Sequence, residues 1–237
     1  MRNGFTLIEM MIVISIIAII AAIAIPSILR SQISSNEISA VGTLRTMIAS
    51  QAQFRGGDVV DQDRDGNGEY GFLQELAGTA TPRTVAGQTP AHIRTGEYIT
   101  QVLGIVYANG IAIRSGYHFY IYLPAAGGTN IGESNPLPAG DAANANDQEA
   151  RFICYGWPAA FDSSGKRCFV VNQQGEVFAA RNVSGGAAAY NGIISVPPAS
   201  AAFLSTYATP DDLTGPFPRA AKGEVGDDGQ IWRPAGS

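Results

Sequence analysis

The chain has 237 residues, of which 46% are hydrophobic and only 15% are charged, and its formal net charge is −5. Average soluble domains carry roughly 25% charged residues, so this composition argues against a highly charged disordered chain, a coiled coil and a basic nucleic-acid-binding protein. We therefore expect no nucleic-acid partner.

The N-terminal segment is the most apolar part of the chain. Residues 10–25 read MMIVISIIAIIAAIAI and carry no charge. As a helix, residues 5–29 would reach about 38 Å, which is enough to cross a hydrocarbon core of about 30 Å. A secretory signal peptide would have a shorter apolar run and a cleavage site of small residues, and the sequence around Pro26 is a poor match. The pattern favours a membrane-spanning helix, and a plain membrane anchor remains open.

Glu9 is the one charged residue within residues 5–29. A carboxylate inside a membrane is costly, so it indicates a functional site and requires a partner. Arg2 is the nearest cation, but it lies on the polar side of the segment, and we identify no partner for Glu9 within one chain. A free amine on a neighbouring chain would serve.

The residues Gly4-Phe5-Thr6-Leu7-Ile8-Glu9, after a short basic leader, resemble the class III signal of type IV pilins and type II secretion pseudopilins. The resemblance covers roughly residues 1–54. It implies that residues 1–4 are a leader peptide and that a membrane aspartyl prepilin peptidase cuts after Gly4 and methylates the amine of Phe5. Glu9 then becomes the fifth residue of the mature chain, where family members carry Glu.

The same resemblance implies assembly through Phe5, Glu9 and Pro26, where many members have a helix-kinking proline. The amine of Phe5 on one subunit would pair with Glu9 of the next, and such non-closing contacts generate a helical filament. The implied partners are identical and related pilin subunits, the peptidase, an inner-membrane assembly platform and, before assembly, membrane lipid. The chain would lie in the bacterial inner membrane with its head outside the cytoplasm, and then in an extracellular pilus or a periplasmic pseudopilus.

Residues 30–57 show the pattern of an amphipathic helix. Pro26 should kink or locally melt the helix, and beyond it the apolar residues fall on one helical face, with Ser39, Thr43, Arg45, Thr46 and Ser50 on other faces. The apolar residues are Val41, Leu44, Met47, Ile48 and Phe54. We expect this face to pack on a globular head and Gly56-Gly57 to end the helix.

Residues 58–95 look like a loop region with a cation site. The sequence from Asp61 to Glu69 resembles the first nine positions of an EF-hand loop. The twelfth position, where such a loop has a bidentate Glu, is Phe72, and Glu75 would serve only in a different geometry. The alternative is a solvated acidic turn, and apart from calcium we expect no cofactor. The candidate ligands are Asp61, Asp63, Asp65, Asn67 and Glu69. A short helix is expected within residues 71–76.

Residues 96–195 carry strand patterns. Residues 117–123 alternate as a half-buried strand that ends at Pro124, residues 124–150 read as a long loop, and further strands are expected at 151–157, 167–172 and 176–180. Residues 196–237 read as an irregular segment that wraps the surface. The expected fold is α+β: a long N-terminal helix, with an apolar transmembrane half and an amphipathic half packed on the head, a small antiparallel sheet of three or four strands, and long loops.

The chain has two cysteines, Cys154 and Cys168. If the strands 151–157 and 167–172 pair around a turn centred on Phe161, the two cysteines face each other at a distance that suits a disulfide. The resemblance implies an oxidising compartment, which favours this pairing. Two reduced, buried thiols are the alternative.

Common catalytic and phosphate-binding motifs are absent from the sequence, and we expect no enzymatic activity. The sequence favours a structural subunit of a type IV pilus-like filament. Two alternatives stay open: a pseudopilin of type II secretion, and a binding module that uses the N-terminal segment only as a membrane anchor.

Overall fold

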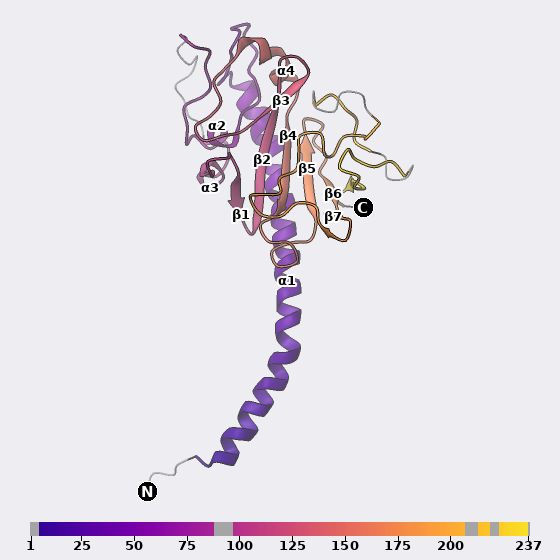
Figure 1. Cartoon of the computed structure of the whole chain (residues 1–237). Helices are drawn as coiled ribbons and strands as arrows, with labels where there is room; N and C mark the ends of the chain where they lie inside the picture. Colours follow the sequence, from indigo (N-terminus) through magenta and orange to yellow (C-terminus); the bar gives the residue numbers. More distant parts are fainter. Residues whose placement is uncertain (1–4, 88–96, 207–212, 219–222, 237) are drawn as a thin grey trace.

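The computed structural model describes residues 5–87, 97–206, 213–218 and 223–236. Its elements in chain order are α1 (Leu7–Gly56), α2 (Leu73–Leu76), α3 (Gln101–Gly104), β1 (Ala112–Arg114), β2 (Tyr117–Ala125), β3 (Thr129–Gly132), the 3₁₀ turn η1 (Ala142–Asn144), α4 (Ala145–Ala150), β4 (Ile153–Pro158), β5 (Cys168–Asn172), β6 (Phe178–Ala180), β7 (Val183–Ser184), β8 (Ala187–Ala188) and β9 (Arg233–Pro234). A long helix and a small antiparallel sheet confirm the predicted α+β class. Figure 1 shows α1 extending from the head as a bare stalk.

Helix α1 consists of two unlike halves. No residue of its first half, as far as Arg30, is buried, and the apolar side chains there lie open. In the second half Leu44, Met47 and Phe54 are fully buried against the head, and the helix ends at Gly56 with Gly57 as its cap. The amphipathic prediction is therefore confirmed for these three residues, while Val41 and Ile48 are partly buried against the same core.

Four polar residues of α1 are also buried in the head, namely Glu37, Thr43, Ser50 and Gln51. Thr43 and Ser50 were expected on other faces, yet both are buried. The Ser50 hydroxyl donates to the carbonyl of Tyr98 at 2.7 Å, and the Gln51 amide both donates to and accepts from Gly71. Buried polar groups need such partners, so the contact face of α1 is wider than its apolar stripe.

The central sheet has the strand order β1-β2-β4-β5-β6-β9, and β3 also pairs with β2. Every pairing is antiparallel. The four strands expected at 117–123, 151–157, 167–172 and 176–180 are all present, but the sheet is larger than expected. Residues 124–150, which were predicted to be a loop, contain β3, η1 and α4.

Both faces of the sheet are covered. Alternate residues of β2, from Tyr117 to Leu123, face α1 in one core, as the alternation predicted. The opposite face was expected to be half-exposed, but Tyr155 and Trp157 lie there in a second core. The C-terminal segment supplies Phe203 and Trp232 to this core, and the Tyr155 hydroxyl donates to the carbonyl of Ala199 at 2.9 Å. The C-terminal segment is thus a second layer rather than a surface wrap.

The predicted disulfide between Cys154 and Cys168 is wrong in this structure, because both cysteines are free and buried. Strand β4 places Cys154 opposite Val171, three residues further along β5 than the prediction required. An odd shift in register also moves a side chain to the other face of the sheet. Cys154 accordingly lies in the core beside α1, whereas Cys168 lies in the core beneath the C-terminal segment.

Candidate functional site

The start of α1 is built around a capping box between Thr6 and Glu9. The backbone N–H and the hydroxyl of Thr6 donate to Oε2 of Glu9 at 2.8 and 2.7 Å, and the N–H of Glu9 donates to the Thr6 hydroxyl at 3.3 Å. This motif satisfies donors at the helix start that would otherwise lack partners. We expected no partner for Glu9 within one chain, and that expectation is wrong. The spacing Thr-x-x-Glu was the signal in the sequence.

The capping box leaves Glu9 capable of a second contact. Both bonds from Thr6 end on Oε2 of Glu9, and Glu9 is exposed. Phe5, next to the box, is 79% exposed. Gly4 and the rest of the leader lie outside the described residues, so cleavage after Gly4 remains a prediction.

The apolar half of α1 has the length and composition to cross a membrane, and none of its most apolar 18-residue window is buried. Pro26 lies inside the helix, which stays continuous through it. The expected local melting does not occur. The ribbon curves along this half instead (Figure 1).

The acidic loop lies at the other end of α1, directly after Gly57. One carboxylate oxygen from each of Asp61, Asp63 and Asp65 lies within 4.8 Å of the others. The amide N–H of Gly66 donates to Asp61 at 3.2 Å, and both the backbone and the side-chain amide of Asn67 donate to Asp65. The structure therefore brings the predicted Asp residues together.

Glu69, at the ninth position of the loop, is not one of the three clustered carboxylates. Its side chain is fully buried, and its Oε1 accepts from the backbone N–H of Gln62 at 2.8 Å. Burial raises the pKa of Glu69 to about 7, and the nearby charge of Asp61 adds to this rise while Gln62 and Arg83 oppose it.

Glu75 does not complete the loop. Its carboxylate accepts from the backbone N–H of Phe72 at 2.9 Å and forms a buried ion pair with Arg83 at 3.0 Å. Phe72, at the twelfth position of the loop, is fully buried in the core.

Sequence reasoning missed Glu149, which α4 brings to the acidic loop. Burial raises the pKa of Glu149, and the charges of Asp65 and Asp63 raise it further, whereas Arg55 opposes the rise. No local pattern could have found this residue, because 84 to 88 residues separate it from the three Asp residues in the sequence.

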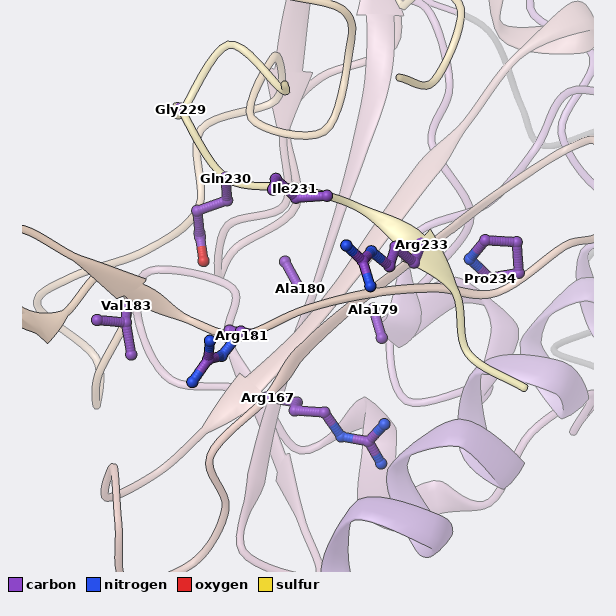
Figure 2. Close-up of a pocket in the computed structure, with 10 residues that line it drawn as sticks. All are labelled: Arg167, Ala179, Ala180, Arg181, Val183, Gly229, Gln230, Ile231, Arg233 and Pro234. Carbon is purple, nitrogen blue, oxygen red and sulfur yellow. The ribbon is translucent and has the colours of Figure 1, made fainter. Parts of the chain in front are cut away.

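A pocket of about 440 Å³ lies at the edge of β6 and β9. Arg167, Arg181 and Arg233 line it, which would suit an anion. Arg167, however, is paired with Glu37 of α1 at 2.7 Å. Figure 2 shows the three guanidinium groups lying apart rather than converging on one point. The arrangement lacks the clustered donors of an anion site.

The fold and the N-terminus define a class: a subunit with a head and an exposed apolar N-terminal helix. The family description "Prokaryotic N-terminal methylation motif" matches residues 1–25. The chain is 36% identical over 95 residues to the type IV major pilin protein PilA of Myxococcus xanthus, which covers 39% of this chain and 41% of that protein. It is 54% identical over 52 residues to the type IV major fimbrial protein FimA of Dichelobacter nodosus, which covers 20% of this chain and 33% of that protein.

The matched part of the chain thus spans less than half the length of these curated relatives. No solved structure matches the chain. The chain is therefore similar to type IV pilins over part of its length, and residues 1–25 carry the methylation motif.

Proposed function

We propose that the chain is a structural subunit of a type IV pilus-like filament. The apolar half of α1 carries this proposal, because it exposes a membrane-length hydrophobic surface that the head of the same chain does not cover. Such a surface requires lipid or other subunits. The similar proteins are named as major pilin and fimbrial proteins, which favours a pilus and a non-catalytic role.

In this proposal the chain has two states. It is first held in the inner membrane by residues 5–29, with its head outside the cytoplasm. A prepilin peptidase removes residues 1–4 and methylates Phe5, and an assembly platform then transfers the subunit into the filament. The apolar halves of neighbouring helices replace lipid around each other, and the heads form the filament surface.

Glu9 sets the register between subunits. In the isolated chain its Oε2 is held by Thr6, which fixes the carboxylate at the helix start. The new amine of Phe5 on a neighbouring subunit then pairs with Glu9 in a low-dielectric environment. The net gain from such a pair is small because both ions lose solvation, whereas removing one partner is costly because the other stays buried and unpaired. The main effect of the pair is therefore to select one register between subunits, and its contribution to the stability of the filament is small.

The experiment is a gene deletion complemented with the wild-type chain or with Gly4→Leu. We expect the deletion to remove surface fibres and the wild-type chain to restore them. Gly4→Leu should leave the leader attached, seen by mass spectrometry as an excess equal to residues 1–4, and should not restore fibres. Intact fibres in the deletion strain together with lost protein secretion would identify a pseudopilin, and intact fibres with normal secretion would indicate a membrane-anchored binding module.

A further inference from the structure

Three carboxylates, those of Asp61, Asp63 and Asp65, gather in the loop that follows α1. Two more interact with their charges: Glu69 of the same loop and Glu149 of α4, a segment far away in sequence. Three of their oxygens are buried and have no hydrogen-bond partner among the described residues: Oδ1 of Asp61, Oε2 of Glu69 and Oε1 of Glu149. A buried acceptor without a partner costs about 1–3 kcal/mol, and more when it is charged. Three such acceptors among carboxylates that interact with one another's charges indicate a missing positive group.

Helix α4 is fixed against the acidic loop by its own contacts. The Gln62 side chain donates to Oε1 of Gln148 at 3.0 Å, and the backbone N–H of Tyr70 donates to the carbonyl of Gln148 at 3.0 Å. Gln148 is buried and directly precedes Glu149. The position of Glu149 beside the three Asp residues is therefore built into the fold.

The protein's own cations do not balance this charge. Arg83 is buried near Glu69, but its guanidinium is paired with Glu75 and also donates to Gln148 and to the carbonyl of Tyr70. Arg55 lies in the last turn of α1, and its charge counteracts the rise in the pKa of Glu149. Its guanidinium group lies over the ring of Tyr70. Arg64 lies within the loop itself and is exposed. Even with Arg55 and Arg64 counted, the five carboxylates leave an excess of negative charge in this part of the described chain.

We propose that Asp61, Asp63, Asp65, Glu69 and Glu149, with the backbone carbonyl of Asn67, bind one calcium ion. The carboxylate of Glu149 takes the place that a glutamate at position 72 would fill in a continuous loop. All donors are oxygens, which excludes metals that prefer nitrogen or sulfur, and six ligands of which some are bidentate suit calcium better than the strict octahedron of magnesium.

The ion would tie the acidic loop to α4, two segments between which the described residues form no ion pair. The acidic loop follows α1, and α4 precedes β4, so calcium would join the top of the long helix to the central sheet. Calcium would act within the head alone, whether or not the chain assembles into filaments.

The test begins with the full chain in detergent, from which EGTA has removed calcium. Calcium is then titrated into it, and the heat of binding is measured by calorimetry. We expect one saturable site with a dissociation constant of about 10⁻³ M or tighter, and weaker binding of magnesium. Calcium at a hundred-fold excess over this constant should raise the melting temperature by about 5 °C or more. The absence of both heat and a thermal shift at 10 mM calcium would overturn the proposal.

Glu149→Gln tests the assignment of α4, with Glu176→Gln as the matched control because Glu176 is exposed and lies between β5 and β6, outside the acidic loop and α4. Glu149→Gln should weaken calcium binding at least ten-fold. In EGTA it should raise the melting temperature, because it removes a charge from a repulsive cluster, whereas in calcium it should lower it. Glu176→Gln should change neither. Unchanged calcium affinity in Glu149→Gln, or a lower melting temperature in both conditions, would contradict the role of Glu149.

Discussion

The two halves of α1 share one continuous helix but have opposite surroundings. In the second half Leu44, Met47 and Phe54 are fully buried in the head. In the first half Ile16, Ile17 and Ile20 are each more than half exposed. Apolar side chains stabilise only what they are packed against. The second half therefore stabilises the head, and the first half serves contacts that lie outside one chain.

The largest effect is expected from Glu9→Ala in the first half. If the carboxylate pairs with a neighbour's amine, its removal leaves that amine buried and unpaired. We expect sheared fibres to be lost while the chain is still present in the membrane and still processed, as shown by its mass. Glu176→Ala, in the head, is the control and should leave fibres intact. Fibres of normal abundance from Glu9→Ala would falsify the intersubunit pair.

A pair of aliphatic substitutions separates the two halves directly. Leu44→Ala should lower the free energy of unfolding of the head by about 2–5 kcal/mol, because it opens a cavity in the core. Ile17→Ala should leave that free energy unchanged in detergent and reduce fibre yield. Tryptophan fluorescence during denaturation is a suitable measurement, since Trp157 and Trp232 are both buried in the head. Equal destabilisation by both changes would contradict the division of α1.

A smaller effect is expected where α1 meets the sheet through Glu37. Its carboxylate accepts from the backbone N–H groups of Lys166 and Arg167 and pairs with the Arg167 side chain at 2.7 Å. Arg167 is partly exposed, so solvent weakens the pair. Glu37→Gln should cost about 1 kcal/mol of unfolding free energy. A loss as large as that of Leu44→Ala would show that the ionic contact, rather than the core, fixes α1.

Because both cysteines are free, a reductant should leave the free energy of unfolding of the head unchanged. Burial raises the pKa of both thiols, so Cys154 and Cys168 should resist alkylation in the folded chain. After unfolding without reductant, mass spectrometry should find two adducts. No adduct under those conditions would mean that a disulfide exists and that the register of β4 and β5 differs from the structure.

Local pattern was sufficient for the helix and for most strands. The alternation in residues 117–123 identified β2 and its buried face, and the apolar spacing around Leu44 identified the half of α1 that packs on the head. The acidic spacing from Asp61 to Asp65 also located three carboxylates that the fold gathers. Each of these signals lies within a few residues of sequence.

Contacts between distant segments could not be read in this way. The register of β4 and β5 depends on the length of the turn that joins them, and a shift of three residues separated the cysteines. Phe203 and Trp232 form the second layer, although the surrounding proline-rich segment has no period. Glu149 is held near the acidic loop by the hydrogen bonds of its neighbour Gln148 with Gln62 and with the backbone of Tyr70.

The central claim is that the exposed half of α1 is the assembly element of a processed pilin. Its most direct test is mass spectrometry of the N-terminal peptide from sheared, purified surface fibres. The account predicts fibres that contain this chain, beginning at Phe5 with a methylated amine. Fibres that lack the chain, or a chain that still begins at Met1, would contradict it.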